Sequence, residues 1–259
     1  MSSEVRHLVD RGQTYPLVQL SGVLGAGSAP MVRSVLLDLL AEQPEAVVVD
    51  VAGLSLDGPG ATEVLRDVRR ETADWPSAHL ALCATDTSVW QGAGWPVWPD
   101  PVQAFAALGE PGPDRRVSLE LEPATGAARI SRELITEQCG RWDCPDLAGP
   151  ACIVVTEMVN NVVAHAHTPM IVLLATHGDG MSVAVRDRST TVPSFDGTPV
   201  PVTAFGGRGM LLIDSVSTRW GSLGLDGGKV VWALIDDEEA AKPTVRKPNG
   251  ASMTDPARG

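Results

Sequence analysis

The chain has 259 residues, enough for one large domain or two of ordinary size, because domains cluster around about 100 to 150 residues. Hydrophobic residues make up 44%, and 20 Lys and Arg against 32 Asp and Glu give a net charge of -12, which disfavours direct nucleic-acid binding. The charged start MSSEVRHLVDRG lacks the apolar region of a secretory signal, and no apolar stretch approaches the roughly 20 residues of a membrane span. We therefore expect a cytoplasmic protein with no membrane partner.

Two breaks in composition divide the chain. The segment GEPGPDRR combines prolines and glycines through which neither a helix nor a central strand continues. From Asp236 onward the sequence has little to bury and cannot offset the entropy of ordering itself. We predict a first domain at 1–108, a linker at 109–116, a second domain at 117–235 and a disordered tail at 236–259.

The first domain alternates β-rich apolar runs with stretches whose apolar residues recur at helical spacing. The predicted strands are Leu17–Leu20, Ala46–Val51 and Leu80–Cys83, and the predicted helices are Ala29–Leu40, Thr62–Arg70 and Val102–Leu108. This alternation is typical of a small α/β domain.

The second domain begins with helices and continues with strands. Helices are predicted at Ala127–Gln138, Leu147–Ala164 and Gly209–Val216, and strands at Met170–Ala175, Met181–Val185, Arg219–Leu223 and Lys229–Leu234. The segment Ser189–Phe205 is rich in Thr, Pro and Gly. An unstructured loop of that length is usually a lid or a binding loop.

The helix predicted at Leu147–Ala164 has an apolar face and a polar face. At 100° per residue the apolar arc contains Ala151, Val155, Met158, Val159 and Val162, and the other arc contains Glu157, Asn160 and Asn161. Asparagine is a poor helix former, so something other than helicity accounts for the adjacent pair. Glu157 and Asn161 lie one turn apart and offer a proton acceptor and a ligand for a hard cation. A stripe that only meets solvent is the alternative.

The segment TEMVNNVVAHA resembles the N-box of the ATPase superfamily shared by gyrase, heat-shock chaperones, histidine kinases and mismatch-repair proteins. The bacterial anti-sigma-factor serine kinases fit best. This resemblance implies a histidine-kinase-like ATP-binding domain, an α/β sandwich that uses ATP and Mg²⁺. It also implies Glu157 as the general base and Asn161 as the Mg²⁺ ligand.

Other segments match the same family in order. Asp187 ends VAVRD, where the family places the carboxylate that accepts from adenine, and GGRGM precedes a helix whose amides approach phosphate. His165, near that pocket, is favoured as a cation at a helix end over a metal ligand paired with His167. The implied ATP-binding residues are Asn160, Asn161, His165, Asp187, Ser189, Gly207, Arg208, Gly209 and Met210.

The likeness has two departures near the expected adenine site. Ser189 stands where the family commonly has glycine, which would narrow the pocket. Many relatives have a threonine in the strand after the GG turn that helps to position the aspartate, whereas Val230 and Val231 occupy that place here.

The first half resembles the STAS domains of anti-sigma-factor antagonists through the stretch VVVDVAGLSLDGPGATEVL. In those domains an Asp-Ser-x-Gly turn carries the serine that the partner kinase phosphorylates. The matching residues here are Asp57, Gly58, Pro59 and Gly60, so the turn has no hydroxyl. One hypothesis makes this half a permanent pseudo-substrate or a gate for a separate antagonist; the alternative is that it scaffolds or dimerises.

Together the resemblances imply a two-domain α/β and α+β chain acting in transcription regulation. We expect an ATP-dependent serine/threonine-protein kinase and anti-sigma regulator of a bacterial partner-switching system. Its partners would be a sigma factor and/or an anti-sigma-factor antagonist, and a homodimer is an expectation from the family. The alternative is a non-catalytic nucleotide-binding regulator that sequesters one of those partners.

Overall fold

The computed structural model describes residues 5–58, 60–76, 79–111, 116–191 and 208–236. Within these ranges the chain forms two five-stranded sheets, one in each half, with helices packed on them. This confirms the mixed α/β architecture in two parts that the sequence predicts. Pro59, Gly207, residues 192–205 of the expected lid and 237–259 of the expected tail lie outside the described residues.

The first sheet has the order β1-β2-β3-β4-β5, with β1 antiparallel to β2 and the other neighbours parallel. Its strands are β1 (Arg6–Asp10), β2 (Leu17–Leu24), β3 (Val47–Leu56), β4 (Leu80–Cys83) and β5 (Val97–Trp98). Helices α1 (Ala29–Ala41) and α2 (Glu63–Glu71) cover one face, and α3 (Pro101–Leu108) covers the other. Each strand and helix predicted for this half is confirmed.

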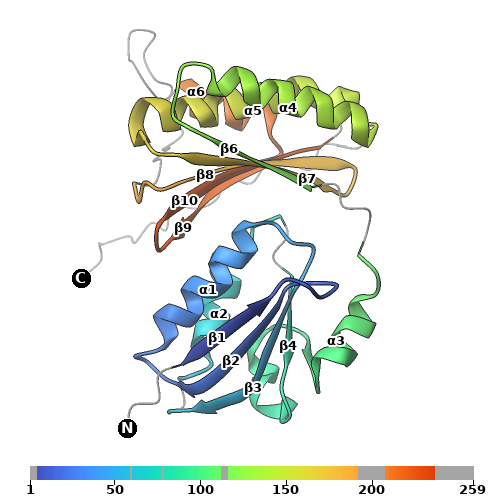
Figure 1. Cartoon of the computed structure of the whole chain (residues 1–259), viewed down its shortest axis with the longest axis vertical. Coiled ribbons are helices and arrows are strands. Elements are labelled where there is room, and N and C mark those ends of the chain that lie inside the picture. Colours follow the sequence, from blue (N-terminus) through green and yellow to red (C-terminus); the bar gives the residue numbers. More distant parts are fainter. Residues whose placement is uncertain (1–4, 59, 77–78, 112–115, 192–207, 237–259) are drawn as a thin grey trace, which may run out of the picture.

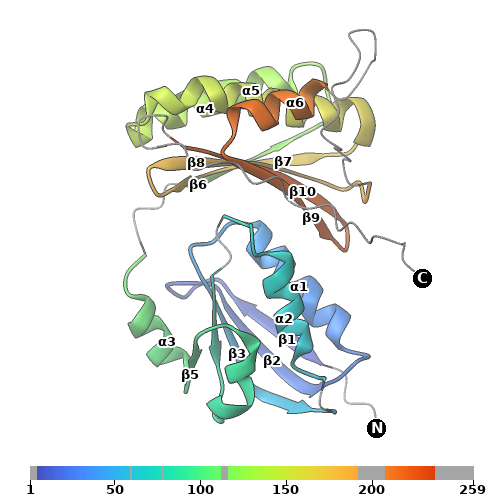
Figure 2. The ribbon, with the colours of Figure 1, turned by 180° about the vertical axis from the view of Figure 1, so that it is seen from behind.

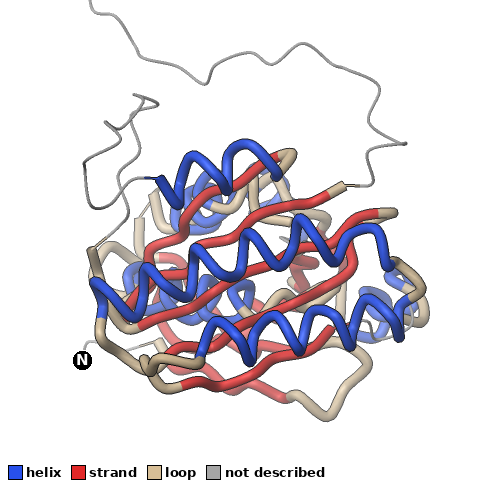
Figure 3. Tube along the Cα trace, turned by 90° about the horizontal axis from the view of Figure 1, so that it is seen from above, coloured by secondary structure: helices blue, strands red, loops and turns tan. Residues whose placement is uncertain are grey.

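The second sheet has the order β6-β7-β8-β10-β9, and every neighbouring pair is antiparallel. Its strands are β6 (Arg116–Leu121), β7 (Met170–His177), β8 (Gly180–Asp187), β9 (Arg219–Leu225) and β10 (Gly228–Ile235). Helices α4 (Ala127–Trp142), α5 (Ala148–Asn161) and α6 (Arg208–Val216) lie side by side on one face (Figure 3). The predicted elements are confirmed, and β6 is an additional strand that begins at Arg116, the last residue assigned to the linker.

Helix α5 is the apolar centre of the second half. A 3₁₀ turn (Pro145–Leu147) precedes it and a π-helical turn (Val162–Ala166) follows it. The stretch Pro145–Ala166 has 22 residues, and its most apolar 18-residue window has a mean hydropathy of 1.4, so by length and composition alone it meets the minimum for crossing a membrane. This corrects the expectation that no such stretch exists. Its buried side chains, which include Val155, Met158 and Val159, pack against the second sheet.

The two halves pack directly on each other. The face of the second sheet that α4–α6 do not cover lies against α1 and the segment after α2, so the layers run helices, sheet, helices, sheet and finally α3 (Figures 1 and 2). The rings of Trp75 and Trp232 meet edge to face, with centroids 5.8 Å apart. At the edge of this interface Arg186 Nη2 lies 2.5 Å from Asp38 Oδ1. One apolar cluster therefore runs continuously from the first half into the second.

The turn that matches the antagonists' phosphoacceptor site lies far from the second half. Gln43, just before β3, accepts a hydrogen bond through its carbonyl oxygen from Arg116 Nη1 at 3.2 Å, so β3 begins beside the second half. The strand then runs away from it for ten residues, and Asp57 and Gly58 follow at the remote end (Figure 1). The hypotheses that the first half is a pseudo-substrate or a gate for a separate antagonist stay predictions. The observed docking uses α1 and Trp75.

Candidate nucleotide site

The polar stripe of α5 is the first component of the site. The residues predicted to face the core are buried, while Glu157 and Asn161 are half-buried and Asn160 is exposed. Helix α5 lies between α4 and α6 (Figure 3). Glu157 and Asn161 are therefore only partly exposed, whereas Asn160 meets solvent.

Glu157 points at the first turn of α6. A Cβ atom added at Gly209 would lie 2.6 Å from Glu157 Oε2 and 3.4 Å from Glu157 Cβ, so a glycine is what leaves room for this side chain. The free amides and the dipole at a helix N-terminus favour a negative charge. The Glu157 carboxylate therefore lies beside a helix N-terminus, where a negative charge is stabilised.

Asn161 faces the same turn of α6. Its side-chain nitrogen lies 3.9 Å from the sulfur of Met210, a weak hydrogen bond that places the amide group beside this turn. A half-turn of the amide presents its oxygen instead, and amide and carboxylate oxygens are the ligands that Mg²⁺ prefers. Glu157, Asn161, Gly209 and Met210 therefore form one group, which we call the α6 group.

Asp187 belongs to a second group at the end of β8. Its side chain is 1% exposed, and Oδ1 accepts from the backbone N–H of Ser189 at 2.6 Å and from Lys229 Nζ at 2.9 Å. Lys229 Nζ also donates to the carbonyl oxygen of Ser189 at 3.2 Å. We call these three residues the Asp187 group. Lys229 is not among the site residues that the sequence predicts.

The turn before β10 explains how Lys229 reaches Asp187. Gly228 has a φ of 151°, and a Cβ there would lie 1.9 Å from the carbonyl oxygen of Asp187, so no side chain fits. This close approach puts Lys229 directly opposite Asp187 in the ladder. Val230 instead packs toward the first half and Val231 toward the helices. The assignment of Val230 and Val231 to the position beside the aspartate is therefore wrong, and Lys229 occupies it.

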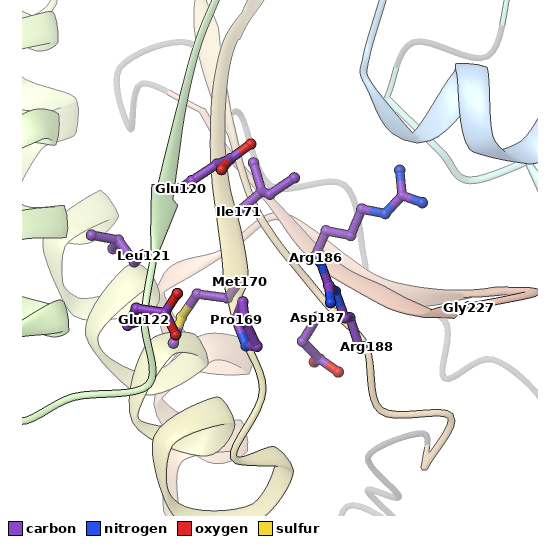
Figure 4. Close-up of a pocket in the computed structure, with 10 residues that line it drawn as sticks. All are labelled: Glu120, Leu121, Glu122, Pro169, Met170, Ile171, Arg186, Asp187, Arg188 and Gly227. Carbon is purple, nitrogen blue, oxygen red and sulfur yellow. The ribbon is translucent and has the colours of Figure 1, made fainter.

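A pocket of about 470 Å³ borders the Asp187 group, within the range of about 300 to 1,000 Å³ typical of small-molecule sites. Its lining residues are Glu120, Leu121, Glu122, Pro169, Met170, Ile171, Arg186, Asp187, Arg188 and Gly227 (Figure 4). Asp187 and Arg186 point to opposite sides of β8, and Arg186 extends toward the first half (Figure 4). The α6 group does not line this pocket. Its convergence with Asp187 on one ligand stays a prediction.

The remaining predicted residues fall outside both groups. His165 is exposed in the π-helical turn, and within the described part of the chain no hydrogen bond joins it to either group. Gly207 lies outside the described residues, and Arg208 is described only as the first residue of α6. Of the connection between β8 and α6, the structure describes residues 188–191, and residues 192–207 lie outside the described residues.

The chain shows only low similarity to known proteins. No family model matches the chain, and no curated protein matches it. Among solved structures, it is similar to an anti-sigma factor antagonist from Mycobacterium paratuberculosis, with 19% identity over 40% of this chain and 93% of that chain and a TM-score of 0.35. It is also similar to the RsbU and RsbW domains of a Mycobacterium tuberculosis protein, with 17% identity over 49% of this chain and a TM-score of 0.37. The chain covers 33% of that second structure.

Proposed function

We propose that the second half binds Mg-ATP and transfers phosphate to a serine or threonine of a separate regulatory protein in a partner-switching system. One observation carries this proposal: Glu157 and Asn161, one helical turn apart, both face the glycine-containing first turn of α6. A base, a cation ligand and an anion-binding helix terminus are the parts that phosphoryl transfer needs, because its catalysis is mainly positioning and charge stabilisation.

Each residue of the candidate site would have a separate role in phosphoryl transfer. Asn161 would hold Mg²⁺, which neutralises charge on the phosphates when bound, and the amides of the first turn of α6 would hold phosphate oxygens. The acceptor hydroxyl oxygen attacks the γ-phosphorus, the bond to ADP breaks, and Glu157 takes the hydroxyl proton. Asp187 would accept a hydrogen bond from the amino group of the adenine ring.

The acceptor in this proposal is a separate protein. Gly58 has no hydroxyl, and the turn that contains it lies at the end of the first half remote from the second sheet. The first half instead covers the second sheet through α1 and Trp75. We therefore propose that it is a fixed scaffold, and that a sigma factor or an antagonist approaches the helical side of the second half.

Phosphoryl transfer from labelled ATP to candidate antagonist proteins tests the kinase proposal. We expect transfer by the wild type, loss of at least about a hundredfold for Glu157→Gln because a general base contributes about 10²–10⁴-fold, and nucleotide binding retained. Glu133→Gln, on the exposed face of α4, is the matched control and should transfer normally. Equal rates for wild type and Glu157→Gln would contradict the role of Glu157.

A non-catalytic nucleotide-binding regulator is the second candidate. One observation favours it: Asp187 Oδ1 already receives hydrogen bonds from Lys229 and Ser189, an arrangement that holds the site in shape without a ligand. For such a regulator, Mg-ATP would bind to both wild type and Glu157→Gln, and neither would transfer phosphate. The same two variants therefore separate the candidates.

A further inference from the structure

Lys229 is a buried cation to which the proposed chemistry gives no role. Its side chain is only 9% exposed, and lysine is almost never fully buried unless it is paired. Its partner is Asp187, whose side chain is 1% exposed. Both residues lie on the face of the second sheet that packs against α4–α6, so this is a polar pair within an otherwise apolar layer.

We infer that Lys229 is a positioning residue that holds Asp187 ready to read the amino group of a purine base. This inference rests on the proposed nucleotide site and adds a residue that determines its base specificity. Lys229 and the Ser189 N–H both donate to Oδ1 of Asp187. Within the described residues no hydrogen bond reaches Oδ2, and a carboxylate has about four lone-pair sites in all. Oδ2 is therefore the oxygen of this carboxylate to which no described residue donates.

The second contact of Lys229 fixes the chain that follows β8. Its ammonium group also donates to the carbonyl oxygen of Ser189, so one cation holds both the carboxylate and the backbone two residues later. The Ser189 hydroxyl in turn accepts from the N–H of Thr191 at 3.3 Å. The backbone at residues 187–191 is thereby given a defined path at the start of the connection to α6.

A fixed single acceptor has a direct consequence for ligand choice. Adenine presents a 6-amino donor to Oδ2, whereas hypoxanthine presents a 6-oxo acceptor that faces the carboxylate with like polarity. A site built to bond one group rejects the analogue that lacks it, because the buried partner is left unpaired. We expect the wild type to prefer Mg-ATP over Mg-ITP by about tenfold to a hundredfold, the range that one hydrogen bond to a charged group supports.

Titration calorimetry of the full chain with Mg-ATP and Mg-ITP tests the inference. For Lys229→Met we expect the ATP-over-ITP preference to fall to within about twofold, while Mg-ITP affinity stays within about threefold of wild type. A merely structural role would weaken both nucleotides equally. Arg219→Met, which removes an exposed cation at the start of β9, is the matched control and should keep the wild-type preference. The double variant Asp187→Asn with Lys229→Met leaves no buried charge but also removes the carboxylate that reads the base, so it is the control for the effect of an unpaired buried carboxylate on folding.

The outcomes separate the two proposals. Binding of Mg-ATP by the wild type together with an unchanged preference in Lys229→Met would overturn the positioning role alone. Tighter Mg-ATP binding by Lys229→Met would also overturn it, and would make Lys229 a plug that occupies the base site. Failure of both wild type and Lys229→Met to bind either nucleotide would overturn the nucleotide site and the positioning role together.

Discussion

The two faces of the second sheet carry different kinds of side chain although they share the same strands. The face toward α4–α6 ends in the buried polar pair of Asp187 and Lys229. The opposite face is apolar around Trp232 and has its ion pair, Arg186 with Asp38, at the margin. Arg186 and Asp187 are consecutive in β8, and successive side chains in a strand point to opposite faces. One strand end therefore contributes to both the interface and the candidate site.

This difference indicates which interactions hold each face. The interface depends on apolar area removed from water and on the packing of aromatic rings. The site instead depends on a buried pair of opposite charges, each of which needs the other as its partner. Changes on the interface face should therefore lower stability without altering ligand preference. Changes on the site face should do both, or alter ligand preference alone.

Truncation of Trp232 should give the largest loss of stability. Trp→Ala changes in cores cost about 3 to 5 kcal/mol, and Trp232 is 4% exposed and packs edge to face on Trp75. Denaturation in urea should show a loss of that size for Trp232→Ala, and Mg-ATP affinity measured below the transition should be unchanged. Val102→Ala, at an exposed position of α3, should change stability by less than about 0.5 kcal/mol. A collapse of nucleotide affinity in folded Trp232→Ala would mean that the faces are not independent.

Removing one partner of the buried pair should come next. Lys229→Met leaves the Asp187 carboxylate buried without its cation, which typically costs about 3 kcal/mol or more. Replacing both residues, with Asp187→Asn and Lys229→Met, should recover most of that loss because no charge stays buried. Equal destabilisation of the single and double variants in urea would show that the pair is not coupled.

Gly209→Ala should change binding more than stability. The added Cβ would meet the flexible end of Glu157, which can move away, so we expect less than about 1 kcal/mol of destabilisation. Moving the carboxylate and crowding the first turn of α6 should weaken Mg-ATP by about tenfold, which is about 1.4 kcal/mol. Gly140→Ala, where a Cβ meets nothing within 4 Å, should raise stability by up to about 1 kcal/mol and leave binding unchanged. Unaltered affinity in Gly209→Ala would place the phosphates elsewhere.

The ion pair at the margin of the interface should matter least. Arg186 and Asp38 have side chains that are 29% and 40% exposed, and pairs of this kind contribute about 0 to 1 kcal/mol. Asp38→Asn should lower stability by that amount, and the effect should shrink in high salt because exposed charges are screened. A loss above about 2 kcal/mol would mean that the pair organises the end of β8, in contradiction to its position at the margin.

The ranges predicted from the sequence cover most elements but not β1, β5 or β6, of which β6 is the longest. Apolar residues alternate in RVSLEL, yet the strand lies at the edge of the sheet and even its apolar side chains are only half-buried. Proline and glycine immediately before it favour a linker, so Arg116 was assigned to the wrong side of the boundary. An edge strand, which has one neighbour, shows a weaker hydrophobic pattern than a central strand. In the central strand β8 the first six of its eight residues, Gly180 to Val185, are all buried.

The Lys229–Asp187 pair was missed for a different reason. Which residue of β10 lies opposite Asp187 depends on the register across the sheet, and a slip of one residue turns every side chain to the other face. Val230 and Val231 are the apolar residues that the strand pattern highlights, whereas the strained turn at Gly228 puts Lys229 in the decisive position. Family resemblance identifies the aspartate but carries no information about a lysine that the family pattern lacks.

The sequence of β10 carries a signal for the interface between the halves. All eight residues of GKVVWALI are buried in β10, and a continuous apolar run indicates a strand covered on both faces. A second covering layer for this sheet was therefore predictable. That layer consists of α1 and the segment around Trp75. Its identity could not be predicted from the sequence, because it depends on how two separate surfaces fit together.

Amide chemical-shift mapping of the full chain during a Mg-ATP titration tests the central claim most directly. The account predicts that signals of Asn161, Gly209, Asp187 and Ser189 shift together along one binding curve with a Kd in the millimolar range or below, while those of Asp57 and Gly58 stay in place. Shifts confined to only one of the two groups, or none at millimolar nucleotide, would contradict a single nucleotide bound across α6 and the end of β8.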